Sequence, residues 1–223
     1  MSRPRLLDLF CGAGGSAVGY HRAGFDVVGV DIAPQPNYPF RFWRRDVMEL
    51  HFWEGGCEGL PFDAIHASPP CQAFSDLKDM HNAKQHEDLL TPTRKLLEAT
   101  GLPYVIENVE GAPMVPTITL CGSSFALGAE GARLQRHRHF EANFPLMGPP
   151  CVHGVARRVI GVYGGHGRDR RRTVNTQDFS TEARREAMDI DWMTGTELSQ
   201  AIPPAYTELI GHQLMQHIQA VAA

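Results

Sequence analysis

The sequence has few of the features that mark secreted or membrane-bound proteins. Its 223 residues include five cysteines, an odd number. The first ten residues, MSRPRLLDLF, run directly into an apolar strand pattern, so we expect no signal peptide. No apolar run approaches the roughly 20 residues that a membrane span needs. We therefore expect a cytoplasmic protein in a reducing compartment, with mostly free thiols and no membrane partner.

A strong overall charge and paired metal ligands are lacking as well. The net charge is −4, so the whole molecule is not an evident binder of polyanions, although one run at 167–172 (GRDRRR) is strongly basic. Cys151 and His153 have the spacing of half a zinc site, but no second pair at metal-ligand spacing accompanies them. The sequence therefore predicts an ordinary loop cysteine and no bound metal.

The sequence alternates between short apolar runs and amphipathic stretches. The length of the chain suits one substantial hydrophobic core. We expect strands over 5–10, 26–31, 62–67, 103–107 and 158–163, a third unit that closes at 45–47, and a basic strand over 133–140. We expect helices over 16–23, 84–100, 181–187 and 205–220. This alternation predicts an α/β fold with a mostly parallel sheet and helices on both faces.

Polar and glycine-rich residues follow several of the predicted strands, at the point where each strand ends. They are Cys11–Gly15, Asp31, Asp46, Cys71 and Glu107. In parallel sheets, ligands gather at the carboxyl ends of the strands. The sequence therefore predicts a cleft at this edge of the sheet.

The turn at 12–15 (GAGG) lets a ligand approach the backbone closely. It is neither the full dinucleotide fingerprint nor a P-loop. Asp31 ends the next predicted strand, where a carboxylate can accept hydrogen bonds from ribose hydroxyls. Together they indicate an adenosine-containing ligand, and the alternative is a glycine-rich bend that binds nothing.

Cys71 and Glu107 are the candidate reactive groups. Pro69 and Pro70 restrict the backbone that enters Cys71, as a nucleophilic thiol in a fixed direction would require. Glu107 ends an apolar strand, where desolvation would keep its carboxyl protonated near neutral pH. The alternatives are an inert cysteine in a turn and an ordinary capping or ion-paired carboxylate.

At these residues the sequence resembles the cytosine-5 DNA methyltransferases. The blocks that carry the resemblance are DLFCGAGG, ASPPCQAFS and ENV, in that order, with looser matches at LCGSSFAL, RHRHF and IPPAYTELIG. The resemblance covers 5–140 and 194–212. It implies a Rossmann-like fold of the kind that binds S-adenosylmethionine, with a small target-recognition region.

The resemblance implies roles for residues at the predicted cleft. Phe10 would stack on the adenine of the cofactor, and the backbone at Gly12 and Gly14 would run alongside its methionine part. Asp31 would hold the ribose hydroxyls, and Asp46 would bind the adenine amino group. Pro70 and Gln200 would complete the set of residues that bind the S-adenosylmethionine cofactor.

The resemblance also implies the reaction, in which a methyl group goes to carbon 5 of a flipped-out cytosine in DNA through a covalent Cys71 adduct. Glu107 would recognise the base, and Arg136 and Arg138 would support the active site or a phosphate. Gln72 and Ser75 would contact the nucleic acid.

The chain departs from the family pattern in three places. Gln200 stands where the family has Asn, and Gln135 is one position out of register before Arg136 and Arg138. The region at 141–193 is short for target recognition, between catalytic segments at 1–140 and 194–223. A chain this short would recognise few bases or rely on a homo-oligomer or partner.

Four arginines in the short region, Arg168, Arg170, Arg171 and Arg172, are candidates for contact with the DNA backbone. The alternative is a solvated loop. A compact enzyme of this kind would suit a phage or a restriction-modification system. Two other functions stay open at this point: an RNA cytosine-5 methyltransferase, and a non-catalytic relative that binds DNA or the cofactor.

Overall fold

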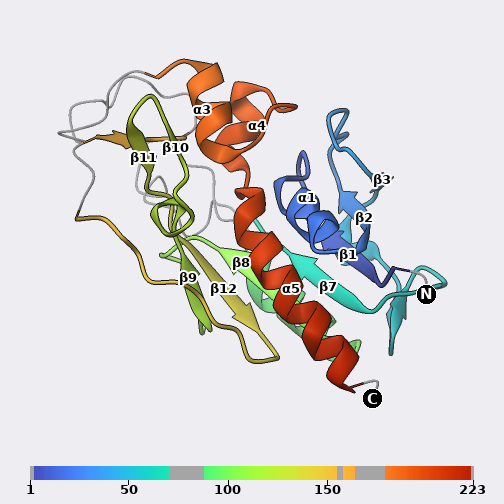
Figure 1. The fold of residues 1–223 in the computed structure, drawn as a ribbon. Helices are drawn as coiled ribbons and strands as arrows, with labels where there is room; N and C mark the ends of the chain where they lie inside the picture. Colours follow the sequence, from blue (N-terminus) through green and yellow to red (C-terminus); the bar gives the residue numbers. More distant parts are fainter. Residues whose placement is uncertain (1–2, 71–87, 155–157, 164–178, 222–223) are drawn as a thin grey trace.

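A seven-stranded sheet forms the centre of the computed structural model, which describes residues 3–70, 88–154, 158–163 and 179–221. The strand order is β3-β2-β1-β7-β8-β12-β9 (Figure 1). Five neighbours run parallel: β3 (Arg41–Arg44), β2 (Asp26–Asp31), β1 (Arg5–Leu9), β7 (Ala64–Ala67) and β8 (Tyr104–Asn108). At one edge, β12 (Arg138–Ala142) pairs antiparallel with both β8 and β9 (Ile118–Leu120).

Helices cover both faces of this sheet, because the central strands are apolar on both sides. Leu6 of β1 packs in the cluster that includes residues of α1 (Gly15–Arg22) and α5 (Pro204–Val221). Leu7 and Leu9 pack in a second cluster, together with residues of α2 (Leu90–Ala99). The predicted α/β fold with a mostly parallel sheet is therefore confirmed.

A third cluster lies at one end of the molecule, where α3, α4, β10 and β11 gather in Figure 1. Its elements are β10 (Gly128–Ala129), β11 (Ala132–Leu134), β13 (Val159–Ile160), α3 (Thr181–Met188) and α4 (Gly195–Gln200). This cluster draws residues from both sides of the expected boundary at 140, and the division into two regions stays a prediction.

In the part of the chain that the structure describes, the remaining short elements are a three-stranded hairpin unit and two 3₁₀ turns. The hairpin strands are β4 (Phe52–Trp53), β5 (Gly56–Cys57) and β6 (Leu60–Pro61), and the turns are η1 (Val47–Glu49) and η3 (Gly122–Phe125). Within the described ranges, no helix combines the length and apolar character that a membrane crossing requires.

Several predicted boundaries need correction. The run at 133–140 is not one strand: β11 ends at Leu134 in a small sheet, and β12 begins at Arg138 in the large one. The third strand unit, which the sequence expected to close at 45–47, ends slightly earlier, because β3 ends at Arg44 and η1 begins at Val47. The strand expected over 158–163 spans only two residues, which pair with Arg133 and Leu134.

Candidate active site

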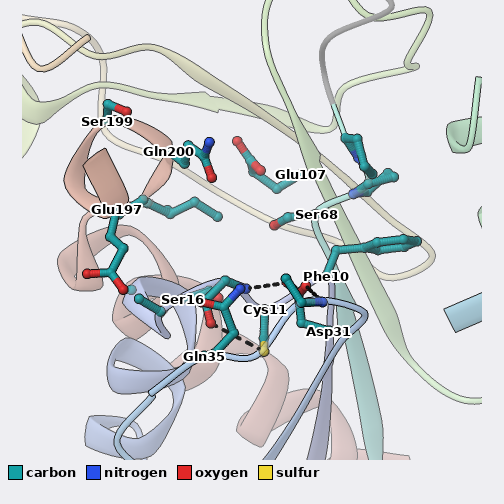
Figure 2. A pocket seen from close by; sticks show the side chains of 18 of the residues that line it. Phe10, Cys11, Ser16, Asp31, Gln35, Ser68, Glu107, Glu197, Ser199 and Gln200 are labelled. Atoms are coloured by element: carbon teal, nitrogen blue, oxygen red, sulfur yellow. Dashed lines mark hydrogen bonds between the residues drawn. The ribbon is translucent and has the colours of Figure 1, made fainter. Parts of the chain in front are cut away.

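A cavity of about 360 Å³ lies at the carboxyl ends of the parallel strands, where the sequence predicted a cleft. Segments at the carboxyl ends of β1, β2, β7 and β8 line it, together with Arg138 of β12 and a segment from the C-terminal part of the chain (Figure 2). The lining includes Phe10, Gly12, Asp31, Ser68, Pro70, Glu107, Arg138 and Gln200. Residues from both ends of the sequence thus share one cavity.

The glycine-rich turn after β1 is held in a left-handed conformation that glycine adopts readily. Gly12 has φ +49° and Gly14 has φ +86°. A Cβ on Gly12 would meet no atom within 4 Å, so its open side faces the cavity that it lines. Gly14 is not part of the lining, and a Cβ there would lie 2.8 Å from the ring of Pro39. Gly14 therefore allows the turn to pack against Pro39.

Asp31 fixes the turn and still faces the cavity. Its Oδ2 accepts a hydrogen bond from the Gly12 amide at 3.0 Å, and its Oδ1 accepts one from the Ala33 amide at 2.9 Å. Each carboxylate oxygen can accept a second hydrogen bond, so Asp31 has capacity left for ligand hydroxyls. Phe10, with φ +54°, also lines this side of the cavity.

Asp46 has a different position from Asp31. Its carboxylate caps η1 by accepting a hydrogen bond from the Met48 amide at 2.9 Å. Asp46 is not among the residues that line the cavity. Its contact with an adenine amino group stays a prediction.

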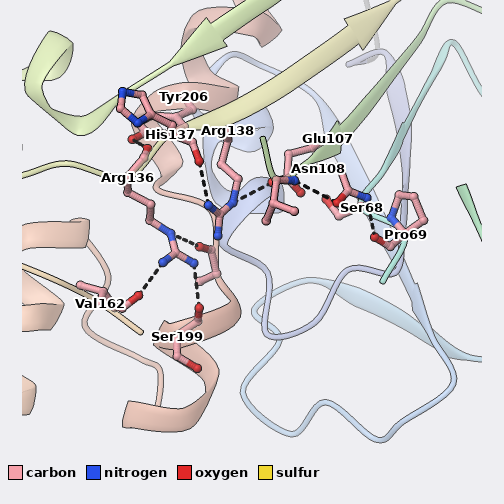
Figure 3. Close-up of polar contacts among 12 residues, drawn as sticks. Ser68, Pro69, Glu107, Asn108, Arg136, His137, Arg138, Val162, Ser199 and Tyr206 are labelled. Carbon is pink, nitrogen blue, oxygen red and sulfur yellow. Dashed lines mark hydrogen bonds and ion pairs between the residues drawn. The ribbon is translucent and has the colours of Figure 1, made fainter. Parts of the chain in front are cut away.

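Glu107, the penultimate residue of β8, lines the cavity with 6% of its surface exposed. The Arg138 Nε lies 2.9 Å from its Oε1 (Figure 3). Burial raises the pKa of Glu107, while the charges of Arg138 and Arg136 and a hydrogen bond with Ser68 oppose that shift. The net direction is upward, so this carboxyl holds its proton to a higher pH than a solvated glutamic acid does.

Asn108, the next residue, ties this strand end to the Pro-Pro segment. Its Nδ2 donates to the Pro69 carbonyl at 3.0 Å (Figure 3). Pro69 and Pro70 line the same cavity as Glu107. The backbone that leads into Cys71 is therefore fixed against the strand that carries the acid.

Arg136 and Arg138 have different surroundings although they lie two residues apart. The buried guanidinium of Arg136 donates to the carbonyls of Val162 at 2.5 Å, Ser199 at 2.8 Å and Ala201 at 3.1 Å (Figure 3). Burial lowers its pKa to about 9. Arg136 is not part of the cavity lining, whereas Arg138 is. Arg136 thus joins three chain segments, and Arg138 faces the acid.

A polar chain behind Glu107 has no signal in the sequence. The Tyr20 hydroxyl lies 3.0 Å from His66 Nδ1, and His66 Nε2 lies 3.0 Å from the Ser68 hydroxyl. Ser68 in turn hydrogen-bonds Glu107. Burial lowers the pKa of His66 to about 3, so the imidazole is neutral. This chain fixes the Ser68 hydroxyl beside the acid.

Asp8 is a second buried acid, in the middle of β1, with the Ser16 hydroxyl 3.0 Å and 3.2 Å from its two oxygens. Burial raises its pKa to about 8, whereas an unfolded chain would ionise it near 3.8. The folded state therefore binds the extra proton between these values, and stability falls as pH rises through that window.

We expect Asp8→Asn to flatten this pH dependence, because the amide mimics the neutral acid. Thermal unfolding from pH 5 to 9 should show wild type losing stability on the order of a few kcal/mol relative to the variant. Asp26→Asn, at the exposed start of β2, is the control and should leave the slope intact. Parallel curves for wild type and Asp8→Asn would contradict this assignment.

Some predicted site residues lie outside the described residues: Cys71, Gln72, Ser75, Arg168, Arg170, Arg171 and Arg172. Gln200 is described, and it lines the cavity as the last residue of α4. Sequence reasoning did not predict α4, although Thr194 and Glu197 form a capping box that marks a helix start.

Comparisons with known proteins point to one family. Residues 4–113 match the family model of C-5 cytosine-specific DNA methylases. The chain is 33% identical over 128 residues to the Type II methyltransferase M.XorII of Xanthomonas oryzae, covering 50% of this chain and 29% of that protein. It is 28% identical over 117 residues to M.FnuDI of Fusobacterium nucleatum, covering 48% and 33%. The alignments thus span about a third of these relatives' length.

Solved structures show the same fold over nearly the whole chain. One is a protein described as a DNA modification methyltransferase encoded within an E. coli prophage. It aligns with a TM-score of 0.63 and 16% identity, covering 97% of this chain and 99% of that one. The shared architecture therefore includes the C-terminal half, beyond the residues that match the family model.

Proposed function

Since the chain belongs, through residues 4–113, to the family of C-5 cytosine-specific DNA methylases, we propose that it methylates carbon 5 of cytosine in DNA with S-adenosylmethionine. One observation carries the proposal. Glu107 with Arg138, and Gly12 with Asp31, line a single cavity of about 360 Å³. Pro70, which directly precedes Cys71, lines it as well. The acid proposed to bind the base, the residues proposed to hold the adenosine part and the segment that precedes Cys71 therefore share one cavity.

The residues on the β1–β2 side of the cavity suit S-adenosylmethionine. Gly12 leaves open the space that a Cβ would fill, Asp31 has free acceptor capacity, and Phe10 supplies an apolar ring. The volume lies in the range of ordinary ligand pockets, roughly 300–1,000 Å³. Gln200, the last residue of α4, would face the methionine part of the cofactor. When bound, the cofactor supplies an electrophilic methyl group.

Cys71 would act on the cytosine ring. Carbon 5 of cytosine is a weak nucleophile, and addition of the Cys71 thiolate to carbon 6 places an electron pair at carbon 5 as an enamine. After carbon 5 is methylated, loss of its proton and expulsion of the thiolate restore the aromatic ring. The reacting carbon is inaccessible in a duplex, so the base must be flipped out.

Glu107 would bind the flipped base as a neutral acid. Its raised pKa keeps a proton available for ring nitrogen 3, and that hydrogen bond withdraws electrons as the thiolate adds to carbon 6. Its other oxygen can accept from the exocyclic amine. Arg138, 2.9 Å away, would stabilise charge that develops on the carboxyl when the proton shifts toward the ring.

The test is nucleoside mass spectrometry of unmethylated, mixed-sequence DNA after incubation with the pure protein and S-adenosylmethionine. Transfer RNA incubated in the same way tests the RNA alternative. We expect 5-methyldeoxycytidine from DNA and no methylated cytidine from RNA. Product in RNA alone would replace the proposed substrate, and binding of S-adenosylmethionine without any product would favour a non-catalytic relative.

The basic run would contact the DNA backbone. Arg170, Arg171 and Arg172 could each neutralise a phosphate, so changing all three to Ala should reduce the slope of log binding constant against log salt by up to about 3. Fluorescence anisotropy with a duplex at several salt concentrations measures the slope. The matched Lys triple variant keeps the charge and should keep the slope. An unchanged slope in the Ala variant would show that these arginines do not contact the DNA backbone.

A further inference from the structure

Two cysteines and two histidines that do not line the cavity meet in one cluster: Cys121, His137, Cys151 and His153. One ligand atom from each lies within 4.8 Å of the others. We propose that these four side chains bind one zinc ion.

The distances suit a tetrahedral site. Cys121 Sγ lies 3.3 Å from His153 Nε2, and Cys151 Sγ lies 3.4 Å from His137 Nε2. Zinc bonds of about 2.3 Å to sulfur and about 2.0–2.1 Å to nitrogen place such atoms about 3.6 Å apart in a tetrahedron. Small movements of the side chains would therefore complete the geometry.

Three separate segments supply the ligands, and hydrogen bonds between protein groups join two of these segments. Cys121 precedes η3, His137 precedes β12, and Cys151 and His153 lie on the loop after residue 150. The Ser124 hydroxyl donates to the Pro150 carbonyl at 2.8 Å, and the Val152 amide donates to the Ser123 hydroxyl at 3.2 Å. These two hydrogen bonds hold the loop that carries Cys151 and His153 against the segment that follows Cys121.

The chemistry of the four side chains favours a closed structural zinc over a catalytic one. Two thiolates and two neutral imidazoles balance the charge of Zn²⁺ and fill all four positions with protein atoms. Glu110 Oε2 lies 3.7 Å from His137 Nδ1, the ring nitrogen that faces away from Cys151. Carboxylates often occupy this outer position and orient a zinc-bound histidine.

The position of the site gives it a consequence for the cavity. His137 lies between Arg136, which binds three carbonyls, and Arg138, which pairs with Glu107. An ion bound to His137 would fix the backbone at the start of β12 and thereby the direction of Arg138. The zinc site would be a positioning device at the edge of the active site.

Metal analysis of the purified protein by mass spectrometry tests the proposal directly. We expect about one zinc per chain in wild type and loss of most of it in Cys151→Ala and His153→Ala. Cys57→Ala removes a buried thiol from β5 and should keep the zinc. Cobalt added to the metal-free protein should give the visible absorption of a tetrahedral thiolate site, which Cys151→Ala lacks.

A second measurement uses the wild-type protein alone, so it does not depend on whether a variant folds. Zinc should protect Cys121 and Cys151 from alkylation, as read by peptide mass spectrometry, and a chelator should expose them. Equal alkylation with and without zinc would overturn the proposal. So would a Cys121–Cys151 disulfide in the freshly isolated protein with no bound metal, because oxidation would then explain the proximity of the two thiols.

Discussion

The Cys71→Ser variant is expected to form no measurable 5-methyldeoxycytidine, a loss of more than about 10³-fold in rate. A hydroxyl ionises far less readily than a thiol and attacks carbon 6 poorly. Without that addition, carbon 5 has no electron pair to offer. The measurement is methyl transfer to DNA, with S-adenosylmethionine binding followed by calorimetry.

Binding of S-adenosylmethionine should persist in this variant, because the residues proposed to hold it lie after β1 and β2 and in α4. The matched control is Cys57→Ser, which removes a thiol from β5, away from the cavity lining. Loss of both binding and transfer would indicate misfolding. Retained transfer with intact binding would remove Cys71 from the mechanism.

The Glu107→Gln variant should lower kcat by roughly 10²–10³-fold, the usual effect of removing one group that stabilises developing charge. The amide has the same size but cannot pass a proton toward ring nitrogen 3. It also removes the carboxyl on which negative charge would develop beside the Arg138 Nε, 2.9 Å away. The rate of methyl transfer on a DNA substrate measures the effect.

The pH profile separates this role from simple packing. Because burial raises the pKa of Glu107, the neutral acid is present below that pKa, and activity falls as pH rises through it. Glu107→Gln should lack this alkaline limb. Glu98→Gln, on the exposed side of α2, should keep both rate and profile. A full-rate Glu107→Gln enzyme would exclude the acid from catalysis.

The sequence predicted the elements whose signals are local. The strand over 26–31 is found with those bounds, and the cavity lies at the strand ends where polar residues follow apolar runs. Short buried strands and glycine turns have local physical causes, so adjacent residues suffice to identify them.

The failures have long-range causes. The run at 133–140 looks like one strand, but the chain changes sheets within it, and Arg136 turns inward to carbonyls of Val162, Ser199 and Ala201. No pattern of neighbouring residues predicts such distant partners. His66 is likewise indistinguishable in the sequence from any polar residue in a strand.

The cysteine and histidine cluster illustrates the same limit. Cys151 and His153 form half of a ligand pattern in the sequence, and the other half comes from two different segments. Metal-ligand spacing can be recognised only when the ligands share one turn or hairpin. Here the strand order brings them together.

The segments that line the cavity come from both ends of the sequence, so they are synthesised at different times. The turn after β1 meets the C-terminal part directly: Trp192 Nε1 donates to the Ala13 carbonyl at 2.9 Å, and Thr207 Oγ1 donates to the Ser16 carbonyl at 2.9 Å. Gly19 lets α5 lie against α1, since a Cβ there would collide with Pro204 and Thr207. On the ribosome, the N-terminal segments of the cavity are therefore exposed to solvent until α4 and α5 have been synthesised and can cover them.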